Sequence, residues 1–262
     1  MDLNWLASDD ELMLMLMPIV VYWVYSGMYE LLGSLDKYRL HSPRQEDTKN
    51  LASKTAVLKG VLLQQLIQAT ITLLVSKMTR EEDDAEANKT NTASVVAAAS
   101  QFLLAMFVFD TWQYFVHRCM HHNKFLYRKF HSWHHRIVAP YAFAAQYNHP
   151  LDGIATETLA GALAYSASGM STSAAVVFFC FATVKGIDDH CGLLLPWNPF
   201  HLLFRNNTAF HHVHHQLAGN KRNFSQPFFV TWDKIFGTYA DFTVVRRKNG
   251  GFEAQIANRS FK

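Results

Sequence analysis

Long apolar runs divide this 262-residue chain and restrict the folds open to it. The runs at 12–35, 57–75 and 95–116 are each close to the length, about 20 residues, that an α-helix needs to cross a bilayer. The second run is the weakest, because a lysine and three glutamines interrupt it. The hydrocarbon core offers no water to backbone polar groups, and helices satisfy these groups internally. The sequence therefore predicts an all-α integral membrane protein, with its transmembrane helices within residues 1–116.

A fourth apolar run, at 154–184, is too long for one untilted span, since a helix rises by about 1.5 Å per residue. Gly169 and several serines and threonines lie in its middle. Such residues favour a turn, so we expect a helical hairpin that enters the membrane and returns on the same side. The hairpin would belong to a catalytic region at 117–262.

The charges of the loops indicate their sides. Segments 36–56 and 117–153 each carry five lysines or arginines, whereas segment 79–90 carries five acids. Lysine and arginine are enriched in cytosolic loops, so the two basic segments are predicted to be cytosolic and the acidic one lumenal. The net charge of +3 suits an anionic membrane surface, and no nucleic-acid partner is expected.

Three clusters of histidine indicate a metal centre. Their spacings are H-x-x-x-H, H-x-x-H-H and H-x-x-H-H, and their members are His117 and His121, then His131, His134 and His135, then His211, His214 and His215. On helices, each spacing places its ring set on one face. Neutral imidazole is a common ligand of iron, zinc, copper and nickel. Eight imidazoles are too many for one ion, so the pattern predicts two metals.

The kind of metal follows from the motifs around it. The sequence has no H-E-x-x-H, no C-x-x-C and no E-x-x-H, which are typical of zinc proteases, thiolate zinc sites and soluble di-iron bundles. A hydrolytic zinc ion needs only three or four protein ligands. Redox-active iron at a membrane surface, beside an apolar hairpin that admits a lipid chain, is the better interpretation.

Several motifs together resemble the fatty acid hydroxylase and sterol desaturase superfamily, and within it the sphingoid long-chain-base 4-hydroxylases. They are HRCMH (117–121), HSWHH (131–135), YNHPLD (147–152), DDHCG (188–192), HHVHH (211–215) and WDKIFGTY (232–239). The resemblance implies a non-haem di-iron, oxygen-dependent monooxygenase of the endoplasmic reticulum membrane. Its substrate would be sphinganine or dihydroceramide, and its electrons would come from NAD(P)H through cytochrome b5 and its reductase.

The resemblance also implies which histidines bind iron. It assigns the eight histidines of the three boxes and adds His190 as a ninth. His149 and His201 are open as further ligands or structural residues. Within HHVHH, the residues His211, His214 and His215 share one helical face, so His212 is expected to point elsewhere.

An acidic residue, Asp110, lies near the end of the third apolar run. An ionisable group there is costly and usually functional, so Asp110 either orients a ligand imidazole or reaches the membrane surface. Asp188 and Asp189 have the same expected role beside His190.

Three functions are open to such a chain. Hydroxylation is the first, and desaturation or oxidation of a sterol C-4 methyl group on the same site is the second. A membrane metal-binding or transport protein is the third. Transport would place the polar ligands within the spans, whereas these boxes lie just outside them.

Overall fold

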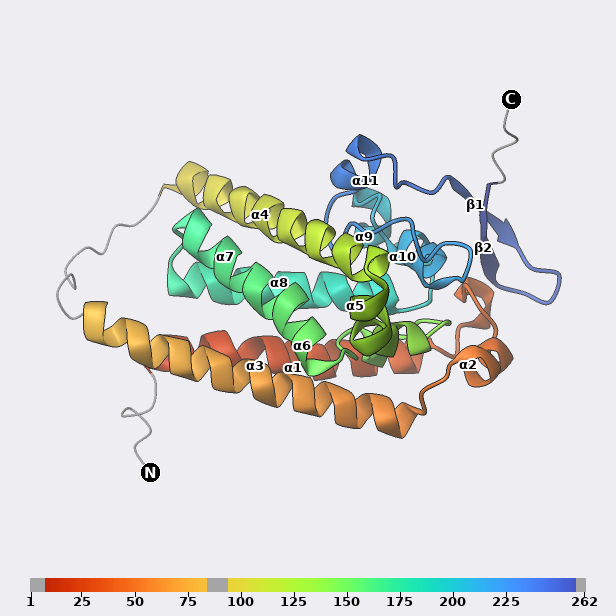
Figure 1. Cartoon of the computed structure of the whole chain (residues 1–262). Helices are drawn as coiled ribbons and strands as arrows, with labels where there is room; N and C mark the ends of the chain where they lie inside the picture. The colour runs from red at the N-terminus through yellow and green to blue at the C-terminus, as the bar shows by residue number, and fades with distance from the viewer. Residues whose placement is uncertain (1–7, 84–93, 258–262) are drawn as a thin grey trace.

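The computed structural model of this chain describes residues 8–83 and 94–257 and is mostly helical (Figure 1). In chain order its elements are α1 (Asp9–Leu32), η1 (Asp36–Tyr38), α2 (Pro43–Lys49), α3 (Lys54–Asp83), α4 (Val95–His122), α5 (Lys124–Lys129), η2 (His131–Arg136), η3 (Ala142–Ala144), α6 (Pro150–Gly153), η4 (Ile154–Thr158), α7 (Leu159–Ser168), α8 (Thr172–His190), α9 (Pro199–Leu203), α10 (Thr208–His215), α11 (Thr231–Ile235), β1 (Phe242–Arg246) and β2 (Phe252–Ile256).

Three of the helices are long and apolar enough to cross a membrane. They are α1, the part of α3 at Lys54–Val75, and α4. Side-chain caps define two of their starts: Ser8 and Glu11 form a reciprocal capping box at α1, and the Ser94 side chain accepts from the Ala97 amide at α4. The predicted membrane fold is confirmed. Helix α4 continues without a break past residue 116 to His122. The predicted boundary between a transmembrane region at 1–116 and a catalytic region at 117–262 stays a prediction.

The outward faces of these helices are apolar. Val24 of α1 is 69% exposed, Leu66 of α3 is 64% exposed and Leu103 of α4 is 59% exposed. Large contiguous apolar surface is unusual on a soluble protein and is typical of a face that meets lipid. The acidic segment that we predicted to be lumenal lies partly at 84–93, outside the described residues.

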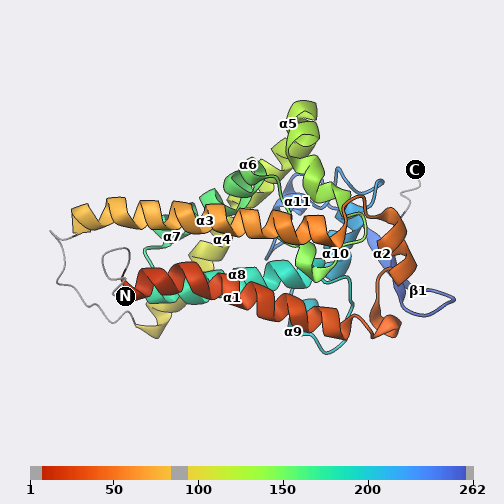
Figure 2. The same cartoon turned by 90° about the horizontal axis from the view of Figure 1, so that it is seen from below.

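The hairpin packs between the spanning helices. Helix α7 lies along α4 and α8 lies along α1, as Figures 1 and 2 show from two directions. Gly169 ends α7 with a φ of 62°, a left-handed conformation that glycine adopts readily, and α8 begins three residues later. Phe109 of α4, Ala160 of α7 and Phe178 of α8 share one buried apolar cluster. Packing of this kind fixes the ends of α4 and α8, which carry histidines.

The short helices and a small sheet gather at one end of the long helices (Figure 1). The sheet pairs β1 with β2 in antiparallel register, from Phe242 opposite Ile256 to Arg246 opposite Phe252. The predicted all-α fold did not include this small sheet. Val213 of α10 packs against Ala254 of β2 in a third apolar cluster, so the sheet supports the helix that carries the third histidine box.

Candidate metal centre

Nine histidines come together in two adjacent groups. The five-histidine group contains His117, His121, His131, His135 and His214, and the four-histidine group contains His134, His190, His211 and His215. Within each group, one ring nitrogen from every member lies within 4.8 Å of those of the others. The groups touch, since the ring centroids of His135 and His215 are 4.8 Å apart. Every histidine that we predicted as a ligand therefore lies in one of the two groups.

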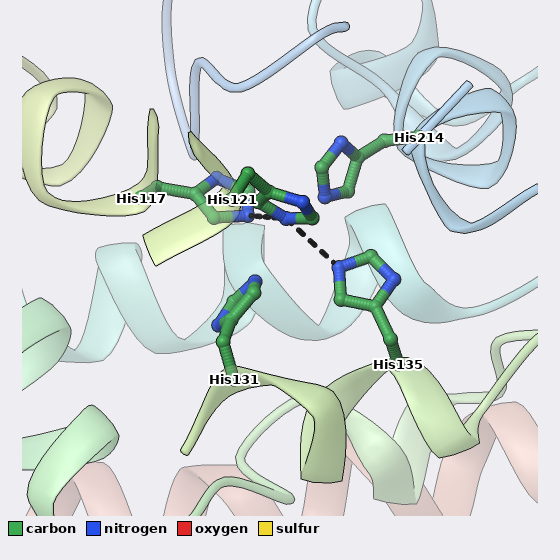
Figure 3. Close-up of side chains that lie close together, drawn as sticks. All are labelled: His117, His121, His131, His135 and His214. Atoms are coloured by element: carbon green, nitrogen blue, oxygen red, sulfur yellow. Dashed lines mark hydrogen bonds between the residues drawn. The ribbon is translucent and has the colours of Figure 1, made fainter. Parts of the chain in front are cut away.

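Four elements supply these rings. Helix α4 contributes His117 and His121, η2 contributes all three histidines of the second box, α8 ends at His190, and α10 contributes the third box. Figure 3 shows the five-histidine group, whose rings approach one another from α4, η2 and α10. Elements far apart in the sequence thus build one centre.

The second box forms a 3-10 helix, where its spacing had indicated one face of an α-helix. The Ile137 amide donates to the His134 carbonyl at 3.1 Å, a bond between residues three apart. Residues three apart align along a 3-10 helix. The rings of His131 and His134 accordingly lie side by side, with centroids 5.7 Å apart and planes at 30°. Each joins a different group, so this box serves both.

Six of the nine rings are held through Nδ1. Each of these Nδ1–H groups donates to an oxygen that can only accept, and the pairs are His117 with Phe224 O, His131 with Asp152 Oδ2, His134 with Tyr147 O, His190 with Gly186 O, His214 with Arg222 O, and His215 with Ile137 O. The proton on Nδ1 leaves Nε2 with a free lone pair. Metal-binding histidines are commonly oriented in this way.

These Nε2 atoms face one another without protons to share. His134 Nε2 and His190 Nε2 are 3.2 Å apart, and neither ring can donate because both Nδ1 protons are already committed. His131 Nε2 and His214 Nε2 are buried and have no hydrogen-bond partner. A cation among the lone pairs would turn each of these unfavourable arrangements into a favourable one. The residues present therefore fit two bound metal ions.

Burial favours the neutral form of four rings in the second and third boxes. It lowers the pKa of His214 to about 3, and it holds the pKa of His135 well below its usual range, with further lowering by His121 and His214. The same cause lowers the pKa of His211 and His215. Neutral imidazole is the form that binds metal, so no proton has to leave these rings near pH 7.

Asp152 is the carboxylate that orients a ring. It accepts from His131 Nδ1 at 2.8 Å and is 1% exposed. We expect Asp152→Asn to lower enzymatic activity about 10- to 100-fold, because the amide can donate and favour the wrong tautomer of His131. Steady-state activity and iron content of the purified variant measure the effect. Asp47→Asn, which changes an exposed carboxylate, is the control; normal activity in both variants would contradict this role.

Of the five histidines outside both groups, three bear on the predicted ligand set, namely His149, His201 and His212. The ring of His212 stacks on His41, with centroids 5.5 Å apart and planes at 16°. His149 caps α6, since its Nδ1 accepts from the Leu151 amide at 3.2 Å. His201 Nε2 lies 3.0 Å from Asp188 Oδ2. The structure therefore gives these three side chains other partners.

The expected contact between Asp110 and an imidazole is not formed. Its two carboxylate oxygens accept from the backbone amides of Phe228, at 3.0 Å, and Phe229, at 2.6 Å. Phe228 belongs to the same apolar cluster as Phe178. Asp110 therefore connects residues 228–229 to α4 by hydrogen bonds. The interpretation of Asp110 as an orienting group for a ligand ring is corrected accordingly.

Asp188 and Asp189 do not orient His190 either. Asp188 accepts from the Tyr29 hydroxyl and from Asn198 Nδ2, and Asp189 pairs with Lys185 Nζ. The His190 ring instead donates from Nδ1 to the Gly186 carbonyl at 2.8 Å.

A cavity of about 490 Å³ lies beside the two groups, between the long helices. His131 of one group and His134 and His190 of the other form part of its wall. Apolar side chains line much of the rest, including Leu14 of α1 and Phe179 of α8. Pockets for small ligands usually have roughly 300–1,000 Å³, and the apolar wall suits a lipid chain.

Polar side chains of the spans also line this cavity, and the sequence-based prediction missed their role. Gln65 and Gln68 interrupt the second apolar run, and in the structure both face the cavity. Gln65 Nε2 donates to Gln146 Oε1 and Gln68 Nε2 donates to Glu157 Oε2, each at 2.9 Å. Polar residues within apolar runs are costly and usually functional, and this was the signal available in the sequence.

Comparison with known proteins gives consistent matches. The sequence profile of the fatty acid hydroxylase family matches residues 102–238. The chain is 58% identical to sphinganine C4-monooxygenase 2 of Arabidopsis thaliana, over 94% of this chain and 95% of that protein. It is 55% identical to sphinganine C4-monooxygenase 1 of the same plant, over 95% of each chain.

A protein with another activity in its name is also similar. The chain is 51% identical to very-long-chain aldehyde decarbonylase GL1-9 of Oryza sativa subsp. japonica, over 94% of this chain and 95% of that protein. No solved structure matches the chain.

The family match and the centre coincide. The matched residues 102–238 make up more than half of the chain and contain both histidine groups and the hairpin. The similar proteins align with almost the whole chain, spans included. This chain belongs to the fatty acid hydroxylase family.

Proposed function

We propose that this chain is a sphinganine 4-hydroxylase, a membrane-bound di-iron monooxygenase that adds a hydroxyl to carbon 4 of a saturated sphingoid base. The observation that carries the proposal is a single cavity whose wall contains candidate ligands from both histidine groups. The two Arabidopsis proteins that align with nearly the whole chain are named for this reaction.

The two histidine groups would each hold one iron ion. Bound iron supplies the activation of dioxygen and the oxidising power to break an unactivated C–H bond. The chain's own residues do the rest of the work. Hydrogen bonds from Nδ1 fix the rings, and burial keeps water from the site. The apolar wall that includes Leu14 and Phe179 would hold the alkyl chain with one carbon toward the rings.

The proposal includes an external electron supply and a place in the cell. Electrons would pass from NAD(P)H through cytochrome b5 and its reductase, and molecular oxygen would be the co-substrate. We place the protein in the endoplasmic reticulum membrane with the histidines toward the cytosol. The lysines and arginines of α2 and α5 support this orientation, because both helices lie at the same end of the long helices as α10 (Figure 1).

Lipid analysis of a cell that lacks sphingoid-base 4-hydroxylation tests the proposal. Expression of this chain should restore 4-hydroxylated bases, which mass spectrometry detects. The same extracts should be examined for 4,5-desaturated bases, oxidised sterols and hydrocarbons derived from aldehydes. An increase in one of these products without 4-hydroxylated bases would assign another reaction to the site, and an unchanged lipid profile would remove the hydroxylase proposal.

A further inference from the structure

Among the described residues, no lysine, arginine or histidine pairs with one carboxylate of the cavity. Three acids line the cavity, namely Glu11, Glu157 and Asp189. Asp189 is paired with Lys185, and Glu11 takes part in the cap of α1 at its start. Glu157 accepts from two neutral amides, Gln68 Nε2 at 2.9 Å and Asn148 Nδ2 at 2.7 Å. Within residues 8–83 and 94–257, no lysine, arginine or histidine forms an ion pair with it.

Glu157 lies on an unusual piece of backbone. The element η4 is a single π-helical turn between α6 and α7, in which the Leu159 amide donates to the Ile154 carbonyl five residues back. Such turns insert one residue into a helix and occur frequently at functional sites. Here the π turn stands at the start of the hairpin, where Glu157 faces the cavity.

Two connections tie this turn to the rings. Thr156 donates its hydroxyl to the Asp152 carbonyl at 2.8 Å, and the Asp152 side chain holds His131. Asn148, which donates to Glu157, directly follows Tyr147, whose carbonyl holds His134. The backbone around Glu157 is therefore connected by hydrogen bonds and chain neighbours to His131 of one histidine group and His134 of the other.

A sphingoid substrate can carry the positive charge that is missing beside Glu157. A buried carboxylate without a countercharge is costly, and a ligand cation in hydrogen-bond contact removes that cost. A free sphingoid base carries an ammonium group on carbon 2, two carbons from the carbon that is hydroxylated. An N-acylated base carries a neutral amide at the same place.

We propose that Glu157 binds the ammonium group of a free sphingoid base and so selects the free base over its N-acylated form. The inference rests on the proposed function, because it presumes a sphingoid substrate. Amides of Gln68 and Asn148 hold the carboxylate, and the ammonium contact fixes the base with carbon 4 toward the rings.

The test uses the full chain, loaded with iron and reconstituted in lipid nanodiscs, with sphinganine and N-acetylsphinganine as a matched pair of ligands. Wild-type protein should bind and hydroxylate sphinganine with about 10- to 100-fold preference, the usual contribution of a charged hydrogen bond. Glu157→Gln should raise the Kd and KM for sphinganine by about the same factor and leave those for N-acetylsphinganine nearly unchanged. Glu157→Asp should keep most of the preference.

Glu253→Gln is the matched control, since Glu253 is an exposed residue of β2. Its preference should equal that of the wild type. Equal use of both ligands by wild-type protein would overturn the inference, and that comparison decides the matter even if Glu157→Gln fails to fold. An unchanged preference in folded, iron-containing Glu157→Gln would overturn it as well. Glu157-dependent sphinganine binding without any 4-hydroxylated product would leave the inference standing and remove the proposed function.

Discussion

Replacement of His214 by glutamine is expected to lower 4-hydroxylation by more than about 100-fold, beyond the usual effect of changing a residue that only orients a ligand. The His214 Nε2 atom is buried without a partner among the rings of the five-histidine group, while its Nδ1 is anchored to the Arg222 carbonyl at 2.7 Å. Glutamine offers a carbonyl oxygen in place of an imidazole nitrogen, and it lacks the Nδ1–H group that anchors the ring to Arg222. Product formation and iron content, measured on the same purified variant, give the result.

His212→Gln is the matched control on the same helix. His212 is also buried, so both substitutions disturb packing to a similar degree, but its ring stacks on His41 outside both groups. We expect this variant to keep most of its activity and its iron. Loss of iron in His212→Gln with retention in His214→Gln would show that the roles of the two residues are reversed.

Replacement of His190 by glutamine is expected to abolish activity and to leave about one tightly bound iron per chain. His190 is one of only four rings in its group, and its Nε2 lies 3.2 Å from that of His134 and 2.9 Å from that of His211. Its loss removes the neighbour of both rings and leaves the five-histidine group complete. Metal analysis after dialysis against a chelator measures the remaining iron.

His122→Gln serves as the control for this variant, because His122 is exposed and lies outside both groups. It should retain the wild-type iron content. Two chelator-resistant irons in His190→Gln would show that His190 is not needed to hold the metal, and would leave three boxes as the whole ligand set.

The parts of this protein that the sequence predicts are those with a local cause. Membrane spans depend on the length and polarity of one continuous segment, so α1, α3 and α4 could be predicted without knowledge of their neighbours. The turn at Gly169 has an equally local origin, in a residue that adopts positive φ.

The parts that could not be predicted depend on contacts between distant segments. The second box gives His131 and His135 to one group and His134 to the other. This division depends on the 3-10 conformation of η2 and on its contacts with the histidines of α4 and α10. The role of Asp110 depends on the amides of residues 228–229, more than a hundred residues away. Glu157 appears in the sequence as one acid at the start of an apolar run, and its meaning depends on Gln68 and Asn148.

We propose that the two histidine groups hold iron that is needed for the reaction. The most direct test of this proposal is metal analysis of the purified wild-type protein together with its turnover of sphinganine. We expect about two irons per chain, loss of activity when iron is removed, and recovery when iron is returned but not when zinc is supplied. A preparation that is fully active with stoichiometric zinc and no iron would contradict the proposal.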